Sequence, residues 1–125
     1  MKIMTKKEIV ENFLKLAASG HPHEAFRLYV GENFRHHNVH FKGDAQTLML
    51  AMEESARKNP NKIFKIHHII AEHNLVAVHS HLKQNSTDLG FVVVHIFKFE
   101  SDKIIELWDL GQPIPSETVN ENGMF

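Results

Sequence analysis

Residues 62–111, KIFKIHHIIAEHNLVAVHSHLKQNSTDLGFVVVHIFKFESDKIIELWDLG, contain the pattern that decides the fold. Apolar residues recur there at a period of two, which predicts four strands at 62–72, 75–83, 89–100 and 103–111. Short links such as Glu72-His73-Asn74 and Glu100-Ser101-Asp102 join them. Because short links connect antiparallel neighbours, we expect a four-stranded antiparallel sheet.

The residues before this sheet have a helical period instead. Thr5-Lys6-Lys7-Glu8 is a capping box that begins a first helix. Pro22 suits the first turn of a second helix. Asp44 can cap a third helix, which Asn59-Pro60 ends. Between the second and third helices, residues 33–43 show no helical period and are expected to form a short strand or an ordered loop.

Helices followed by a meander of strands are typical of an α+β fold. At 125 residues the chain fits a single domain, 1–125. We expect the N-terminal helices to pack on one side of a curved, mainly antiparallel sheet and to enclose a pocket.

Composition narrows the classes of function. The formal net charge is −1, so no basic face for nucleic acid is expected. No apolar run is long enough to cross a membrane. The chain has no cysteine, which excludes disulfides and thiolate metal sites and fits a cytoplasmic protein. The first residues show no signal-peptide apolar segment. Histidine is the unusual residue, at 11 positions.

Strand alternation sorts the histidines by face. His79 and His81 share one face of the second predicted strand, opposite Val76, Val78, Ser80 and Leu82. His95 shares a face with Phe97 in the third strand. We expect His79, His81 and His95 to face a common cavity, with His37 joining them from the irregular segment. His67 and His68 are adjacent, so they should point to opposite faces.

The last predicted strand carries Asp109 on the same face as Ile105 and Leu107, opposite Ile104, Glu106, Trp108 and Leu110. A carboxylate among apolar groups must be paired, hydrated or shifted in pKa. Either Asp109 acts on a ligand, or it has a structural role as a strand-end cap or the partner of a buried histidine.

Three stretches together resemble the SnoaL-like polyketide cyclases, which belong to the nuclear-transport-factor-2-like (NTF2-like) superfamily. The stretches are His37-Asn38, the segment VVVHIFKF after Gly90, and KIIELWDLGQP at 103–113. The Trp-Asp-x-x-Gln-Pro motif and the Asn-Gly-Met-Phe end are similar to a subgroup described as predicted aldol-condensation catalysts. The resemblance implies a cone-shaped α+β barrel with a pocket and a homodimer formed through the outer sheet face.

The resemblance also implies site residues. In the cyclases a strand-borne aspartate is the acid/base and a histidine assists it; Asp109 matches the aspartate and His37 the histidine. Further ligand-binding residues are expected at His79, His81, His95, Phe97, Gln112 and Asn38. The sequence departs from the pattern at His36-His37-Asn38-Val39, where Gln-His-Asn-Pro is usual, at His95, where aspartate is frequent, and at Leu107, where histidine is common.

Three functions therefore stay open. The first is a lyase or cyclase acting on a small carbonyl compound, with no metal and no cofactor. In that reaction Asp109, made more basic by desolvation, removes a proton next to the carbonyl. The second is a non-catalytic protein that binds a small apolar ligand. The third is a metalloprotein using His79, His81 and His95, although these histidines can equally line the pocket or the dimer face.

Overall fold

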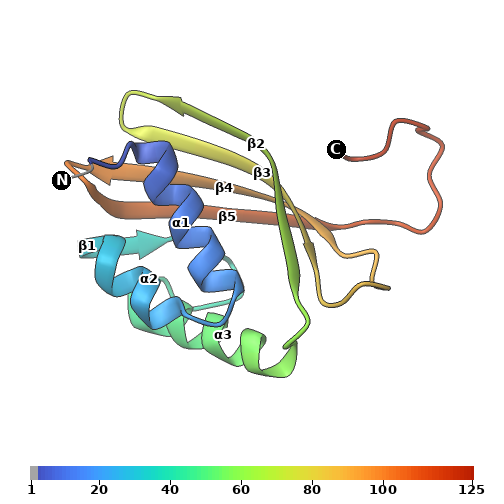
Figure 1. Ribbon diagram of the computed structural model, residues 1–125, viewed down its shortest axis with the longest axis horizontal. Helices are drawn as coiled ribbons and strands as arrows, with labels where there is room; N and C mark the ends of the chain where they lie inside the picture. Colours follow the sequence, from blue (N-terminus) through green and yellow to red (C-terminus); the bar gives the residue numbers. More distant parts are fainter. Residues whose placement is uncertain (1–2) are drawn as a thin grey trace.

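A computed structural model describes residues 3–125, and it contains three helices and one five-stranded sheet (Figure 1). The helices are α1 (Lys6–Ala18), α2 (Pro22–Tyr29) and α3 (Ala45–Lys58). The predicted caps are present: Thr5 and Glu8 bond reciprocally at the start of α1, and the Asp44 carboxylate accepts from the Thr47 amide. These caps satisfy amides that have no partner within the helix.

The sheet has the strand order β1-β5-β4-β3-β2. Its strands are β1 (Val30–His36), β2 (Ile63–Glu72), β3 (Leu75–Lys83), β4 (Phe91–Glu100) and β5 (Lys103–Pro113). The four later strands pair antiparallel, as predicted. The one additional strand, β1, pairs parallel with β5. It begins at Val30, before the strand or loop expected at residues 33–43. The sheet is therefore mainly antiparallel with one parallel edge strand.

Two irregularities in the ladders change which residues face the helices. Lys98 pairs with Glu106 but Phe99 pairs with Ile104, so Ile105 is an extra residue in β5. The prediction that Ile104 and Leu107 point to opposite faces of the sheet is therefore wrong, because a bulge shifts the alternation of side chains by one residue. Both side chains are fully buried in the core.

A second irregularity lies in β2. Ile66 pairs with Ser80 and His68 pairs with His79, so His67 is the extra residue. The expectation that His67 and His68 point to opposite faces is wrong for this reason. Both rings instead lie near His79, at centroid distances of 6.0 Å for His67 and 5.2 Å for His68.

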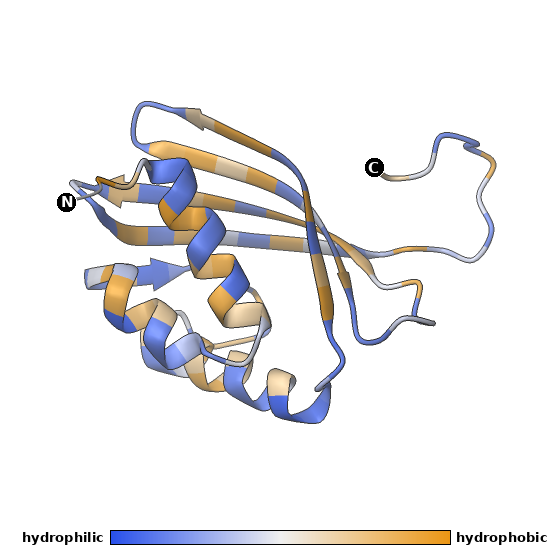
Figure 2. Ribbon diagram, in the orientation of Figure 1, coloured by the Kyte–Doolittle hydropathy of each residue, from blue (hydrophilic) through white to orange (hydrophobic). Residues whose placement is uncertain are grey.

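The core lies between α1 and the inner face of the sheet. Figure 2 shows hydrophobic residues spaced between hydrophilic ones along α1 and along the strands. Phe13 from α1 meets Phe97 from β4 edge to face, with ring centroids 5.6 Å apart. Phe26 from α2 completes the cluster against Phe13 and Phe34. This packing holds the helices over one side of the sheet. Within residues 3–125, no helix combines the length and hydropathy needed to cross a bilayer.

Phe97→Ala should lower the free energy of unfolding by about 3–5 kcal/mol, because Phe97 is fully buried and truncation leaves a cavity. Phe91→Ala in the same strand is the control; Phe91 is 41% exposed and should cost on the order of 1 kcal/mol. Urea denaturation followed by circular dichroism measures both. Equal losses would contradict the placement of Phe97 in the core.

Candidate functional site

A cavity of about 260 Å³ lies between the helices and the inner face of the sheet. Its apolar wall includes Leu14, Leu48, Met52, Phe64 and Val93. Its polar lining is Asn38, Ser55, Lys62, His95 and Asp109. A small, largely apolar cavity with a few converging polar groups is typical of a small-molecule site.

The polar centre of the cavity is the pair formed by His95 and Asp109. The two residues are direct partners across the antiparallel β4–β5 ladder. His95 Nε2 lies 3.2 Å from Asp109 Oδ1, and their side chains are only 11% and 18% exposed. Asn38 Nδ2 donates to the other carboxylate oxygen, Oδ2, at 2.7 Å. Both oxygens of Asp109 thus have a polar partner.

Asn38 is held in place by the turn that follows β1. The backbone N–H of Asn38 donates to His36 Nδ1 at 3.1 Å. The side-chain Oδ1 of Asn38 accepts from the backbone N–H of His40 at 3.0 Å. His36 Nε2 lies 2.7 Å from the Lys42 carbonyl. The tautomer with the proton on Nε2 satisfies both contacts of His36. The turn therefore fixes the side chain that orients the Asp109 carboxylate.

The pKa of Asp109 is lowered. Burial raises this pKa. The hydrogen bond and the positive charge of His95 lower it, and so do the hydrogen bond from Asn38 and the charge of His36. These four lowering effects together outweigh burial. The expectation that desolvation makes Asp109 more basic is wrong for this reason. The carboxylate is ionised at neutral pH and is paired.

Two buried polar atoms near this pair have no hydrogen-bond partner within the part of the chain that the structure describes: His95 Nδ1 and Ser80 Oγ. Val78 pairs with His95 and Ser80 with Val93, so Ser80 is a diagonal neighbour of His95 on the inner face. When His95 is neutral and donates from Nε2 to Asp109, its Nδ1 carries a lone pair. In this tautomer Nδ1 is a buried acceptor without a donor among the described residues.

His37 does not join Asp109 in the cavity. Its Nε2 lies 2.6 Å from Glu106 Oε2, and its ring stacks on Trp108 at 5.0 Å. Arg35 Nε lies 2.9 Å from the same carboxylate oxygen. The pKa of Glu106 is lowered by the hydrogen bonds of Arg35 and His37. Chain alternation explains the difference, because His36 and Asn38 turn inward while His37 turns outward.

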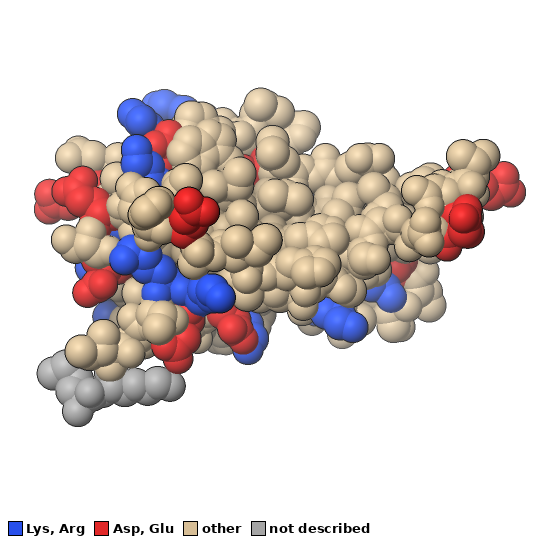
Figure 3. Space-filling view, turned by 90° about the horizontal axis from the view of Figure 1, so that it is seen from above, with Lys and Arg blue, Asp and Glu red and all other residues tan. Residues whose placement is uncertain are grey.

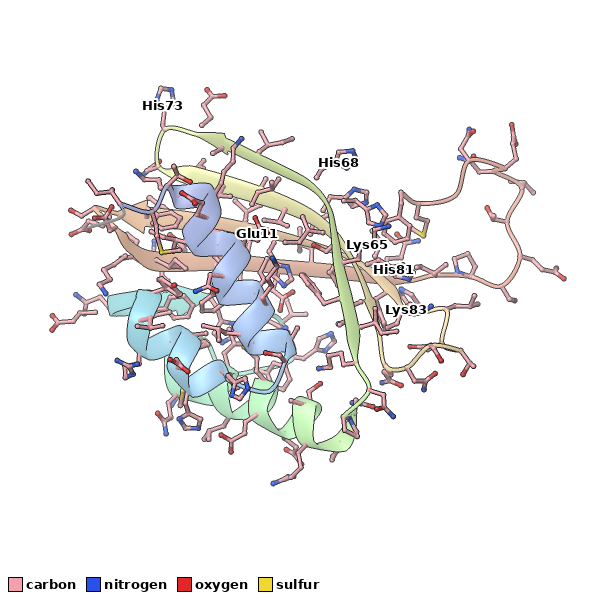
Figure 4. The ribbon with its side chains drawn as sticks, in the orientation of Figure 1. Glu11, Lys65, His68, His73, His81 and Lys83 are labelled. Atoms are coloured by element: carbon pink, nitrogen blue, oxygen red, sulfur yellow. The ribbon has the colours of Figure 1, made fainter. Side chains whose placement is uncertain are left out.

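His79 and His81 lie on the outer face of the sheet, so the expectation that they face the cavity is wrong. Val76, Val78 and Ser80 are the buried residues of β3, and the histidines alternate with them. Figure 4 shows His81 and His68 on the side of the sheet away from the helices. There the C-terminal residue, Phe125, stacks on His81 at 4.5 Å.

The remaining predicted site residues divide between the cavity and other parts of the fold. Asn38 and His95 line the cavity with Asp109. Phe97 is a core residue under α1 and does not line the cavity. Gln112 is exposed near the end of β5, opposite Val92. Because His95 faces inward and His79 and His81 outward, these three histidines cannot share a metal ion. Across residues 3–125, no group of three or more His, Asp or Glu side chains is arranged to hold one.

Sequence reasoning missed three polar residues of this region. Lys62 and Ser55 line the cavity, and Ser80 is buried beneath it. Lys62 directly precedes β2 and Ser55 lies in the last turns of α3. Nothing in their local sequence separates them from the many exposed lysines and serines. Only Ser80 carried a signal, because it alternates with Val76 and Val78 in a strand.

No protein-family model and no curated protein matches the sequence significantly. Solved structures do share its fold. A loop-truncation variant of IdmH aligns with a TM-score of 0.75 at 12% identity, over 86% of this chain and 93% of that one. An NTF2-like protein of unknown function from Cytophaga hutchinsonii aligns with a TM-score of 0.71 at 18% identity, over 90% and 96%.

A third neighbour is a candidate isomerase of the SnoaL-like family from Agrobacterium tumefaciens. It aligns with a TM-score of 0.70 at 14% identity, over 87% of this chain and 99% of that one. The chain therefore has the NTF2-like fold, in which helices close one side of a curved sheet. SnoaL-like proteins are among those that share this fold, as the resemblance implied.

Asp109→Asn should lower the free energy of unfolding at pH 7 by about 1–3 kcal/mol, because it leaves the buried His95 side chain without its charged partner. The folded-state pKa of Asp109 is below its ordinary value of 3.8, so its ionised form stabilises the protein above that value. That contribution is lost as the pH falls through the lowered folded-state pKa.

The difference in unfolding free energy between the natural chain and Asp109→Asn should therefore shrink as the pH falls from about 5 to about 3. Urea titrations at several pH values measure it. Asp102→Asn, in the exposed turn between β4 and β5, is the matched control for loss of one carboxylate. A difference that grows toward low pH would contradict the assigned direction.

Proposed function

We propose that this protein binds a small carbonyl compound in the cavity, and that Asp109, supported by His95, moves a proton next to the carbonyl group. The observation that carries the proposal is the buried His95–Asp109 pair at 3.2 Å on an otherwise largely apolar cavity wall. A positioned carboxylate within reach of a substrate proton is the basic requirement for general acid–base catalysis.

The proposed step removes a proton from the carbon beside the carbonyl. The proton moves to the Asp109 carboxylate, and the electrons of the C–H bond form the enolate, with the charge on the former carbonyl oxygen. In an aldol-type condensation the enolate carbon then attacks a second carbonyl carbon, and the proton returns to the new alkoxide. His95 and Asn38 hold the carboxylate in one orientation through this cycle.

The lowered pKa of Asp109 restricts the substrate. Burial raises this pKa, but the contacts with His95 and Asn38 outweigh it, so the carboxylate is a weaker base than an ordinary aspartate. A weak base removes protons efficiently only from acidic C–H groups. We therefore expect a substrate whose reacting carbon lies between two carbonyl groups, as in 1,3-diketones.

A second candidate function is binding of a small apolar ligand without catalysis. The observation that favours it is that both oxygens of Asp109 already have partners, as a purely structural carboxylate would. Under this function a ligand would bind the apolar wall, and binding would survive the loss of the carboxylate.

Exchange of the acidic protons of acyclic 1,3-diketones in D₂O, followed by NMR, separates the two functions. The natural chain should exceed the buffer rate, and Asp109→Asn should reduce the protein-dependent rate by about 100-fold or more. Ligand binding measured by thermal shift should change far less. Asp102→Asn is the control and should exchange normally. Full exchange activity in Asp109→Asn would sink the proposed mechanism, and saturable binding without exchange would favour the binding function.

We also propose that the chain forms a homodimer through the outer face of the sheet. Ile70, Leu75 and Leu110 are 65%, 42% and 55% exposed there. Figure 3, which shows the molecule from above, has many of its Lys, Arg, Asp and Glu side chains toward the two ends and mostly other residues between them. Exposed apolar side chains that gather on one face mark interaction surfaces.

Sedimentation at micromolar concentration should give twice the mass of the chain. Leu110→Asp should shift the equilibrium toward monomer by about tenfold or more, because it places a charge in the apolar contact. Leu50→Asp on α3, where Leu50 is 46% exposed, is the control and should stay dimeric. A monomer over the whole micromolar range would exclude the dimer.

A further inference from the structure

Lys62 is a polar cavity residue that the acid–base proposal leaves unused. It lies between the end of α3 and the start of β2, and it lines the cavity that also contains His95 and Asp109. Its Nζ donates to Ser55 Oγ at 2.7 Å. Phe64, two residues later in β2, also lines the cavity, so the lysine enters from a largely apolar wall.

The surroundings of Lys62 differ from those of the surface lysines. Lys15 pairs with Glu11 and Lys58 with Glu54, and both pairs are exposed. No ion pair within residues 3–125 involves Lys62, which is half-buried and has a neutral hydroxyl as its hydrogen-bond partner. Burial lowers the pKa of Lys62, which increases the share of neutral amine. A neutral amine in an apolar setting is a nucleophile toward carbonyl carbon.

We propose that the Lys62 amine is a second reactive group of this cavity and forms an imine with the carbonyl group of a bound aldehyde or ketone. The nitrogen lone pair adds to the carbonyl carbon and the carbon–oxygen π bond breaks, which gives a carbinolamine. Loss of one water molecule then forms the C=N bond, and protonation of nitrogen gives an iminium ion. The inference rests on the proposed function in one respect, that the cavity accepts a carbonyl ligand.

An iminium ion would extend the acid–base step from 1,3-diketones to ordinary aldehydes and ketones. Asp109 is a weak base, and the proton beside an ordinary ketone is too weakly acidic for it. A positively charged C=N group withdraws electrons from the adjacent carbon more strongly than a carbonyl group. The neighbouring proton then becomes acidic enough for a weak carboxylate. Lys62 lies directly before β2 and Asp109 lies on β5, and β3 and β4 separate these two strands in the sheet.

Reductive trapping tests the imine on the full chain. Benzaldehyde with cyanoborohydride at neutral pH converts an imine into a stable benzylamine, and peptide mass spectrometry locates it. Benzaldehyde has no proton on the carbon next to its carbonyl group, so trapping does not require the acid–base step. Lys65, which is exposed on β2 three residues after Lys62, is the internal control (Figure 4). We expect Lys62 to be modified about tenfold faster or more, because the cavity holds the aldehyde near the amine.

Variants then separate this inference from the proposed function. Lys62→Arg should remove the fast modification, whereas Lys65→Arg should leave it unchanged. Asp109→Asn should lose proton exchange and still be trapped at Lys62. In the natural chain, trapping at Lys62 without proton exchange would support the imine and count against the acid–base role. Modification of Lys62 no faster than Lys65 in the natural chain would overturn the imine, whatever the exchange experiment shows.

Discussion

The pairing register between β4 and β5 places His95 directly opposite Asp109, and the site depends on that register. A shift of β5 by one residue would turn Asp109 to the outer face and leave His95 behind, because side chains alternate along a strand. The bulge at Ile105 lies between the tight turn of this hairpin and the pair. It lets Ile104 and Leu107 both enter the core while Asp109 still faces the cavity.

The chemistry of the cavity follows from how its charges are compensated. Asp109 is buried but keeps its charge, since His95 and Asn38 offset the cost of desolvation. Lys62 has no such partner, and its amine responds to burial in the usual direction. One wall of the cavity thus holds a stabilised carboxylate, while another holds an amine whose charged form is disfavoured. Such a contrast is a common basis for dividing acid–base and nucleophilic roles.

The high histidine content has two separate structural explanations. His36 and His95 face inward, where they support Asn38 and Asp109. A second group on the outer face of β2 and β3 surrounds the end of the chain, and it consists of His67, His68, His79 and His81. His79 Nε2 lies 3.0 Å from the Met124 carbonyl, and Phe125 stacks on the neighbouring rings. These outer histidines hold the C-terminal tail against the sheet rather than lining the cavity.

The sequence by itself determined the helices and the four antiparallel strands, because capping residues, strand period and short turns are local signals. It also singled out Asp109 as a carboxylate among the apolar residues of a strand. Its resemblance to SnoaL-like proteins pointed correctly to the NTF2-like fold. Only the tertiary structure decided the partners of Asp109. Bulges at Ile105 and His67 leave no mark in the local pattern, yet each changes which residues face inward. Asn38, and not His37, contacts Asp109, and Lys62 lines the cavity. Both facts depend on long-range strand pairing, which local periodicity does not encode.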